Sequence, residues 1–342
     1  MKNKFLKILL CFVVLFGLAG CGTKSNNNEK ENEQNGSNGQ QEETKKVNIV
    51  DVNSKTRPYA VMINNHKAAR PTAGLQDAYL VYEIVVEGGI TRYLALFKDV
   101  DVEKIGSVRS SRHYYLDYAM ENDAIYTHFG WSTVAKEQIP KLGINNVNGY
   151  TTEGNAFWRD NTLGRAYEHT AFTSTKKIAD AVKKRGYRTE TNKDLLLNYS
   201  ADEIDLSKKT GAIKADNVSI KYSSYQTASY KYDKENKVYV RSSAGKVDTD
   251  LVTGKSITVK NIITYQVEDV SYDGTSSLRD IKNIGSGTGY YISNGYAVPI
   301  TWEKSSREAQ TIYKYQDGSE IVVNDGNTFI QIQPKKQKLT IE

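Results

Sequence analysis

The chain has 342 residues, of which 39% are hydrophobic and 25% are charged, and its formal net charge is +6. Such a composition is ordinary for a globular protein, and the length allows roughly two domains. The positive excess is too small for a nucleic-acid-binding protein, which carries a concentrated basic face. We therefore expect no nucleic-acid partner.

The first twenty residues are laid out like a secretory signal. Three lysines in the first seven positions precede an apolar run over residues 8–16, and small residues lead up to Cys21. A transmembrane anchor is the alternative, but a span requires roughly 20 apolar residues. We expect residues 1–20 to be a cleaved signal peptide, and loss of its three lysines takes the net charge from +6 to about +3.

The Leu18-Ala19-Gly20-Cys21 segment resembles the lipobox of bacterial lipoproteins. In such proteins the cysteine is diacylated and becomes the new N-terminus, and two acyl chains suffice for stable anchoring. The resemblance implies a protein anchored by lipid on Cys21 to the extracytoplasmic face of the cell membrane. The other cysteine, Cys11, lies in the signal, so we expect neither a disulfide nor a thiolate metal site in the folded part.

Residues 21–46 hold almost no apolar side chain and are expected to form a disordered tether behind the lipidated cysteine. After the tether, the periodicity of the apolar residues predicts a first domain over residues 47–200. It favours strands over 59–63, 78–86, 93–97 and 123–129 and helices over 110–122, 132–142 and 174–185. Ser110 and Ser174 are candidate N-caps, and Gly186 would end the last helix.

The composition changes after about residue 200, where β-branched residues and tyrosines alternate. Asp-Gly or Asn-Gly pairs at residues 273, 294, 317 and 325 signal hairpin turns. We therefore expect an antiparallel, β-rich C-terminal domain over residues 201–342. The fold class is α+β, with a mixed α/β layered N-terminal domain preceding it.

Two β-rich runs on either side of Gly88-Gly89 predict a hairpin. With a two-residue turn, Glu83, Glu87 and Arg92 would project from one face. One interpretation is a polar site in which Arg92 binds an anion and a glutamate acts as a general base. The other is a structural ion pair, since a buried carboxylate needs a partner in any case. We favour the ion pair.

A second cluster, Arg109, Arg112 and His113, lies at the start of the helix expected over residues 110–122. Free N–H groups at a helix N-terminus attract anions and disfavour arginines that have no anionic partner. The cluster therefore indicates either a bound phosphate or carboxylate or ion pairs with Glu83 or Glu87. We leave both interpretations open.

His128 is expected at a strand end, where functional residues often lie. With Trp131, Arg159 and His169 it could line a cleft, although a lone histidine of this kind is more often structural. The four histidines lack metal-binding spacing, so we expect no metal. No dinucleotide-binding or serine-hydrolase motif is found, so no cofactor is expected and enzymatic activity stays open.

Several segments together resemble one family, the YerB-like lipoproteins of Gram-positive bacteria, which have tandem domains of unknown function. The segments are RPYAVMINN at 57–65, ARP at 69–71, EGGITR at 87–92, IGSVRSSR at 105–112 and WEK at 302–304. One departure is Ser107, where the family usually has proline. The resemblance implies an α+β body with a β-rich C-terminal domain, and it implies no reaction.

Two functions remain in competition. The first is a membrane-anchored binding or adaptor protein whose anion-binding cleft takes a cell-wall polymer or an envelope protein. The second is an enzyme acting on phosphate-bearing or acidic wall polymer, with Arg92, Arg109 and Arg112 stabilising negative charge. In the enzyme, Glu83 or His113 would move protons. A solute-binding lipoprotein is disfavoured because it would have two similar α/β lobes.

Overall fold

The computed structural model describes residues 45–274 and 277–342. The expected signal peptide, Cys21 and nearly all of the tether lie outside these residues. The segment from Lys45 to Glu342 forms one compact unit. Within the described residues, no helix has both the length and the hydropathy of a membrane span.

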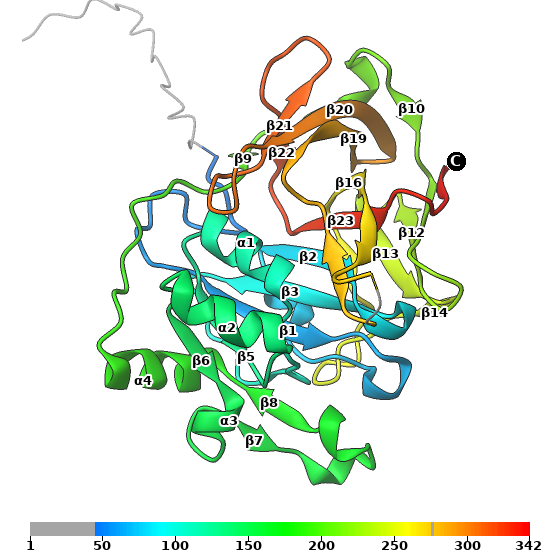
Figure 1. Cartoon of the computed structure of the whole chain (residues 1–342). Coiled ribbons are helices and arrows are strands. Elements are labelled where there is room, and N and C mark those ends of the chain that lie inside the picture. Colours follow the sequence, from blue (N-terminus) through cyan, green and yellow to red (C-terminus); the bar gives the residue numbers. More distant parts are fainter. Residues whose placement is uncertain (1–44, 275–276) are drawn as a thin grey trace, which may run out of the picture. The chain divides into compact units, whose positions relative to one another are not determined.

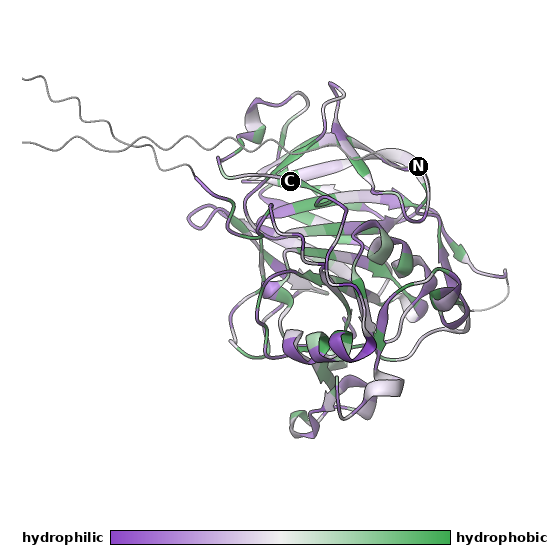
Figure 2. Ribbon diagram, turned by 90° about the vertical axis from the view of Figure 1, so that its left-hand side faces the viewer, coloured by the Kyte–Doolittle hydropathy of each residue, from purple (hydrophilic) through white to green (hydrophobic). Residues whose placement is uncertain are grey.

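An 11-stranded sheet built from both halves of the sequence organises this unit (Figure 1). In sheet order its strands are β10 (Ile213–Lys214), β20 (Tyr296–Lys304), β19 (Gly285–Ser293), β16 (Asn261–Val267), β23 (Thr328–Pro334), β2 (Leu80–Val85), β3 (Thr91–Phe97), β1 (Tyr59–Asn64), β5 (Ile125–His128) and β6 (Asn146–Asn148), with β21 (Ile312–Tyr315) paired to β20. Figure 2 shows the strands stacked across the view, with apolar stretches running through the sheet.

A second, six-stranded sheet is antiparallel throughout. Its strands are β14 (Lys246–Val247), β13 (Val238–Ser243), β12 (Thr227–Asp233), β11 (Asn217–Lys221) and β24 (Leu339–Ile341), with β15 (Thr258–Val259) paired to β13. Three small sheets complete the β structure: β4 (Ile105–Gly106) with β8 (Ala171–Thr173) and β7 (Trp158–Arg159), β9 (Asn198–Ser200) with β22 (Val322–Asn324), and β17 (Asp269–Ser271) with β18 (Arg279–Ile281).

The helices all come from the first half of the described chain. They are α1 (His113–Glu121), α2 (Thr133–Lys141), α3 (Gly149–Thr152) and α4 (Thr175–Arg185). Short 3₁₀ segments are η1 (Lys67–Ala69), η2 (Leu75–Asp77), η3 (Glu87–Gly89), η4 (Asn161–Leu163), η5 (Tyr167–His169) and η6 (Leu206–Lys208). Figure 1 shows α1 and α2 in front of the strands that form the middle of the large sheet.

Local signals predicted α4 correctly and misplaced the start of α1. Ser174 caps α4 by accepting a hydrogen bond from the Lys177 N–H at 3.2 Å, and Gly186 ends it in the left-handed conformation. The predicted cap at Ser110 is wrong, because α1 begins after Arg112, whose backbone is extended. The Ser111 N–H donates to the carbonyl of Gly130, which holds this segment against the neighbouring loop.

The α+β fold class is confirmed, with mostly antiparallel pairing. Within it, β23 pairs parallel with both β2 and β16, which no turn signal predicted. The Asn294-Gly295 turn does connect β19 and β20, whereas Asp325-Gly326 leads into β23 and makes no hairpin. A domain boundary near residue 200 stays a prediction, but both halves contribute strands to the same sheet.

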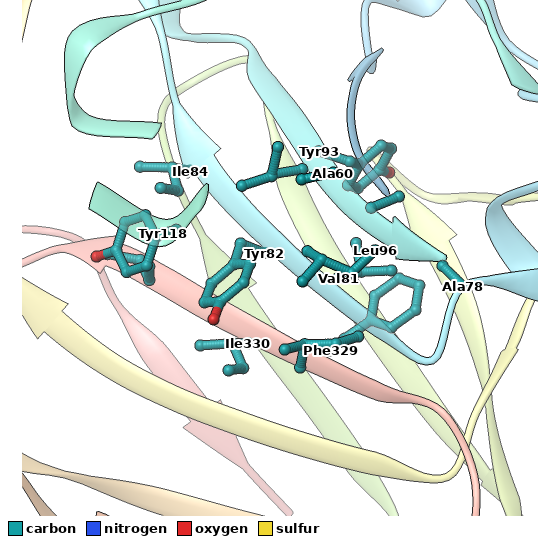
Figure 3. Packing of buried hydrophobic residues seen from close by; sticks show 14 of the residues in the cluster. Ala60, Ala78, Val81, Tyr82, Ile84, Tyr93, Leu96, Tyr118, Phe329 and Ile330 are labelled. Carbon is teal, nitrogen blue, oxygen red and sulfur yellow. The ribbon is translucent and has the colours of Figure 1, made fainter. Parts of the chain in front are cut away.

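The core lies on both faces of the large sheet (Figure 3). On one face, the rings of Tyr82 and Tyr118 lie 4.7 Å apart and pack α1 against β2. The Tyr82 hydroxyl donates to Glu121, and the fully buried Lys304 binds the same carboxylate at 2.7 Å. Because Lys304 belongs to β20, this buried ion pair joins the two halves of the sequence.

The β2–β3 hairpin has a register different from the predicted one. Glu83 faces Tyr93 and Ile84 faces Arg92, and the two glycines lie in a wider loop closed by the hydrogen bond from Val86 N–H to the Ile90 carbonyl. A shift of one residue moves a side chain to the other face of the sheet. The expected grouping of Glu83, Glu87 and Arg92 on one face is therefore wrong.

We predict that Gly295→Ala is more damaging than Gly245→Ala. Both glycines have positive φ, +79° and +80°, so both substitutions incur the cost of a left-handed backbone, about 1–2 kcal/mol. A Cβ at residue 295 would also lie 2.7 Å from the Tyr232 ring, whereas the space at residue 245 is open. Urea denaturation should show an extra loss of about 1–3 kcal/mol for Gly295→Ala. Equal losses would contradict close packing between the two sheets at this turn.

Candidate anion-binding site

Four strands from the first half of the chain, β1, β2, β5 and β6, end at one edge of the large sheet, which we call the carboxyl edge. β1, β5 and β6 are parallel, and β2 runs the same way because both β1 and β2 are antiparallel to β3. The loops at this edge carry His66, Glu87, Trp131 and Tyr150, and Arg92 lies where β3 begins. Ligands of open α/β sheets commonly bind at such an edge.

Arg92 is a nearly enclosed cation, with 4% of its surface exposed. One amino group donates to the Ser110 carbonyl, while Nε is buried and has no hydrogen-bond partner. Burial, reinforced by repulsion from Arg112 and Arg109, lowers the pKa of Arg92 to about 9. In the described part of the chain no carboxylate forms an ion pair with it. A buried guanidinium in this state strongly favours a nearby anion.

Arg112 is the N-cap of α1 and, unlike Arg92, forms an ion pair with a carboxylate. Its side chain bonds both carboxylate oxygens of Glu87 at 2.7 and 2.8 Å through Nε. Although burial opposes ionisation of Glu87, the bond to Arg112 holds the pKa of that carboxyl below its usual value. Of the two interpretations left open by the sequence, an ion pair with Glu87 is thus present for Arg112.

Arg109 is half-buried and lies on the other side of the group. Its Nη1 donates to the main-chain carbonyl of Glu168 at 3.0 Å. Burial lowers the pKa of Arg109, and the charge of Arg112 lowers it further, although Glu168 opposes this. Arg92, Arg109 and Arg112, which we call the arginine group, therefore contain more positive charge than the carboxylates beside them offset.

Two stacked imidazoles, His66 and His169, adjoin Arg109. Their ring centroids are 5.1 Å apart and their planes differ by 13°. The carboxamide of Asn64 accepts from the His66 main-chain N–H through Oδ1, so its Nδ2 donates to His169 Nδ1 at 2.9 Å. His66 Nδ1 likewise accepts from the Ala68 N–H. Both neutral rings therefore carry their proton on Nε2.

Partial burial and nearby cations keep these imidazoles neutral. Burial is the main cause that lowers the pKa of both His66 and His169, and the positive charge of Arg109 lowers each further. The pair can thus donate two N–H groups without adding charge. His66 was missed in the sequence, although its place directly after a buried strand is the signal that could have identified it.

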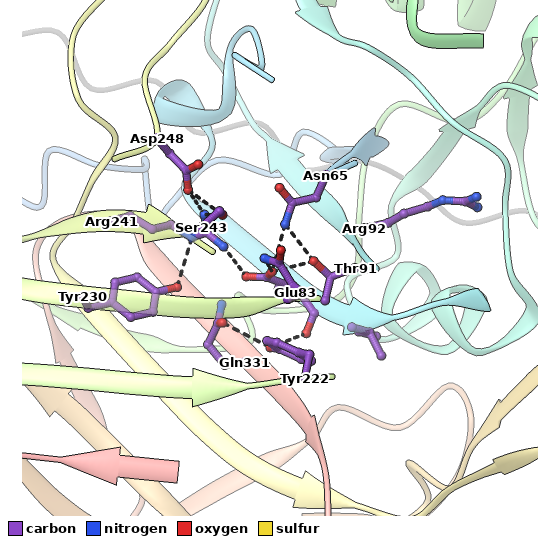
Figure 4. Close-up of polar contacts among 12 residues, drawn as sticks. Asn65, Glu83, Thr91, Arg92, Tyr222, Tyr230, Arg241, Ser243, Asp248 and Gln331 are labelled. Atoms are coloured by element: carbon purple, nitrogen blue, oxygen red, sulfur yellow. Dashed lines mark hydrogen bonds and ion pairs between the residues drawn. The ribbon is translucent and has the colours of Figure 1, made fainter. Parts of the chain in front are cut away.

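Glu83 lies on the face of the β2–β3 hairpin opposite to that of Arg92, and it belongs to a buried network (Figure 4). Its carboxylate accepts hydrogen bonds from Asn65 and Thr91 and binds Arg241 of β13 at 2.6 Å, with both charged side chains fully buried. Arg241 also pairs with Asp248. Figure 4 shows Arg92 pointing away from this network. Glu83 is thus a structural ion-pair residue and is not part of the arginine group.

A cavity of about 390 Å³ lies beside this network, between the loop after β1 and the β13–β14 hairpin. Arg70, from the loop after β1, donates to the Ser243 carbonyl of β13 at 3.2 Å. Lys67, Lys246 and Asp248 also line the cavity. These charges are of mixed sign, and we assign the cavity no ligand.

His113 and His128 both have structural partners. His113 Nε2 lies 3.2 Å from Asp280 Oδ1, and burial lowers the pKa of His113 more than Asp280 raises it. His128 is fully buried and bonds the Gly130 carbonyl through Nδ1 at 2.7 Å. The arrangement therefore brings together Arg92, Arg109 and Arg112, with Glu87 as a counter-ion, whereas His113 and His128 have their hydrogen-bond partners outside this group. Among the described residues, no group of three metal-ligating side chains occurs.

Comparisons with known proteins agree with this fold. A family model described as "Protein of unknown function (DUF3048) N-terminal domain" matches residues 45–188, and the model of the DUF3048 C-terminal domain matches residues 218–330. "Putative lipoprotein YerB" of Bacillus subtilis (strain 168) is 32% identical over 286 residues, which cover 82% of each chain. The crystal structure of YerB from Bacillus subtilis matches with a TM-score of 0.72 at 30% identity, covering 83% of this chain and 94% of that one.

The Glu83–Arg241 pair should be essential for stability. Glu83→Gln leaves Arg241 with Asp248 alone in a buried site, and we expect a loss of about 3 kcal/mol in the free energy of unfolding. Arg241→Met should cost a similar amount, because it isolates two carboxylates. The double variant, measured by urea denaturation, should lose clearly less than the sum of the two. Additive losses would contradict direct coupling.

His128 should make the protein acid-sensitive. Burial lowers the pKa of His128 from 6.5 to about 4, so in that window the unfolded chain binds a proton that the fold excludes. The contribution of neutral His128 to the free energy of unfolding is complete above pH 6.5. It falls as the pH drops toward 4, by roughly 3 kcal/mol in total. His128→Gln should therefore show a flatter fall in unfolding free energy between pH 7 and 4.5. The same slope in both proteins would show that His128 is not buried in its neutral form.

Proposed function

We propose that this chain, which belongs to the YerB-like family of proteins with tandem DUF3048 domains, is an envelope lipoprotein that binds an anionic group at its carboxyl edge. The pattern that ends at Cys21 and the name of the Bacillus subtilis relative support lipid anchoring on the extracytoplasmic face of the membrane. The anion would be carried by a cell-wall polymer or by another envelope protein. In either case the role is that of a binding or adaptor protein.

The buried guanidinium of Arg92 is the observation that carries the proposal. Its Nε has no partner, it forms no ion pair among the described residues, and two further arginines stand beside it. A structural arginine at this depth would pair with a carboxylate, as Arg241 does with Glu83. A phosphate or carboxylate oxygen would supply the missing acceptor and reduce the repulsion among the three cations.

Hydrolysis of an anionic wall polymer is the second candidate, and the stacked imidazoles favour it. The Nε2–H groups of His66 and His169, together with Arg109, could stabilise charge that develops on a scissile group. The residues expected to move protons are engaged elsewhere, however. Glu83 binds Arg241 on the other face of the sheet, and His113 binds Asp280. We therefore favour binding over catalysis.

Substitution of Arg92 tests the binding site directly. Titration calorimetry at low ionic strength should detect inorganic phosphate binding to the wild-type protein, and Arg92→Met should weaken it at least tenfold. Because Met replaces an unpaired buried charge, this variant should keep or raise its melting temperature. Phosphate should raise the melting temperature of the wild-type protein only.

Arg188→Met is the matched control. Arg188 pairs with Asp123 just before β5, at the opposite edge of the large sheet, so its removal should leave phosphate binding unchanged. Absence of binding by the wild-type protein would contradict the proposal. So would equal binding by the wild-type and Arg92→Met proteins.

A further inference from the structure

Exposed tyrosines border the arginine group and its neighbouring loops. The chain has 24 tyrosines, and four of them are exposed: Tyr150, Tyr167, Tyr225 and Tyr272. Tyr225 lies beside Gly89 in the loop that carries Glu87, and the ring of Tyr272 is 5.1 Å from that of His113. The other two lie on the Arg109 side. Tyrosine is therefore exposed at this edge and at least partly covered elsewhere.

Tyr150 is held in place although 68% of it is exposed. Its ring packs edge-on against Phe129 and Trp131, with centroid distances of 5.6 and 5.7 Å. Gly130 allows this position, because a Cβ there would come within 3.0 Å of the Tyr150 ring. The position of the ring is thus fixed by its neighbours before any ligand arrives.

Tyr167 is held in a different way and is 64% exposed. The guanidinium of Arg159 covers its ring at 3.8 Å and also lies 4.4 Å from the Phe129 ring. Tyr167 directly precedes Glu168, whose carbonyl accepts the hydrogen bond from Arg109. A pre-positioned aromatic surface therefore adjoins an excess of positive charge.

We propose that the anion bound at the carboxyl edge belongs to a glycan, whose sugar rings pack on Tyr150 and Tyr167 while its anionic groups face the arginine group. The inference rests on the proposed function and narrows its ligand class. Tyrosine offers a rigid, amphipathic surface at low entropic cost, which suits the apolar faces and hydroxyl rims of sugars. Exposed tyrosines on several separate segments suit an extended chain better than a small ion.

The arginine and tyrosine combination could also serve single-stranded nucleic acid, in which bases stack on aromatic rings. The net charge, about +3 without the three lysines of the expected signal peptide, is small for that purpose. An acidic peptide would use the arginines without needing the tyrosine surface. A glycan uses both features, and the experiment separates the three classes.

Two pairs of polymers, each with a sugar-bearing and a sugar-free member that carry the same kind of charge, isolate the role of the sugars. Binding of poly(glycerol phosphate) with and without attached glycosyl groups should be compared for wild-type protein, Tyr150→Ala/Tyr167→Ala and Tyr150→Phe/Tyr167→Phe. Oligogalacturonate and polyglutamate form the corresponding carboxylate pair, and a 12-residue oligothymidylate tests nucleic acid. All titrations use the same low ionic strength, because charge contacts are screened by salt.

We expect the wild-type protein to prefer the sugar-bearing member of at least one pair by about tenfold or more. The alanine double variant should lose that preference and keep its affinity for the sugar-free polymer, whereas the phenylalanine variant should retain the preference because the rings remain. Near-wild-type melting temperatures should accompany both variants, since these rings are exposed.

The outcomes separate this inference from the proposed function. Arg92-dependent binding of the sugar-free polymers, polyglutamate included, that is as tight as that of their sugar-bearing partners or tighter would overturn the glycan assignment and leave the anion site standing. Binding of no anion by the wild-type protein would overturn both. Tighter binding of oligothymidylate than of either glycan would overturn the glycan assignment in favour of nucleic acid.

Discussion

Side chains alternate between the two faces of β2 and β3, and the register of this hairpin places Glu83 and Arg92 on opposite faces. The separation decides what each charge can do. Glu83 faces the six-stranded sheet and is neutralised by Arg241 in a fully buried pair. Arg92 faces α1, where no carboxylate of the described chain forms an ion pair with it and where Arg109 and Arg112 lie close by. A register one residue different would bring both charges to one face.

The same alternation ties the two halves of the sequence together. On one face Glu83 binds Arg241 of β13, and on the other Glu121 of α1 binds Lys304 of β20. Between them β23 is inserted beside β2 within the large sheet. Removal of one partner from either pair leaves an uncompensated buried charge. The carboxyl edge is thus held on a rigid framework, which suits a binding site whose rings and guanidinium groups need fixed positions.

Local features of the structure could be predicted from the sequence. Ser174 and Gly186 bound α4 as expected, and Asn294-Gly295 forms the expected hairpin because both residues adopt positive φ there. Membership of the family was also recognised from short segments. The structure brings Arg92, Arg109 and Arg112 together and pairs Arg112 with Glu87, while anion binding by this group stays a prediction.

Long-range features could not be predicted. The β2–β3 register depends on the conformation of the loop around Gly88-Gly89, in which both glycines have a φ of +71°. Arg241 is 158 residues from Glu83, so no local pattern relates them. The surroundings of Tyr150 and Tyr167 likewise arise from loops that meet only in the folded chain. Features set within one helix or strand can therefore be predicted from the sequence, whereas contacts between residues far apart in the sequence cannot.

We propose that Arg92 is an anion-binding group and not a structural one. A crystal structure of residues 45–342 grown with inorganic phosphate would distinguish these two roles. We predict a phosphate whose oxygens lie within hydrogen-bonding distance of the Arg92 guanidinium and of at least one of Arg109 and Arg112. A structure in which Arg92 instead pairs with a carboxylate of the protein, with no anion at the carboxyl edge, would contradict the account.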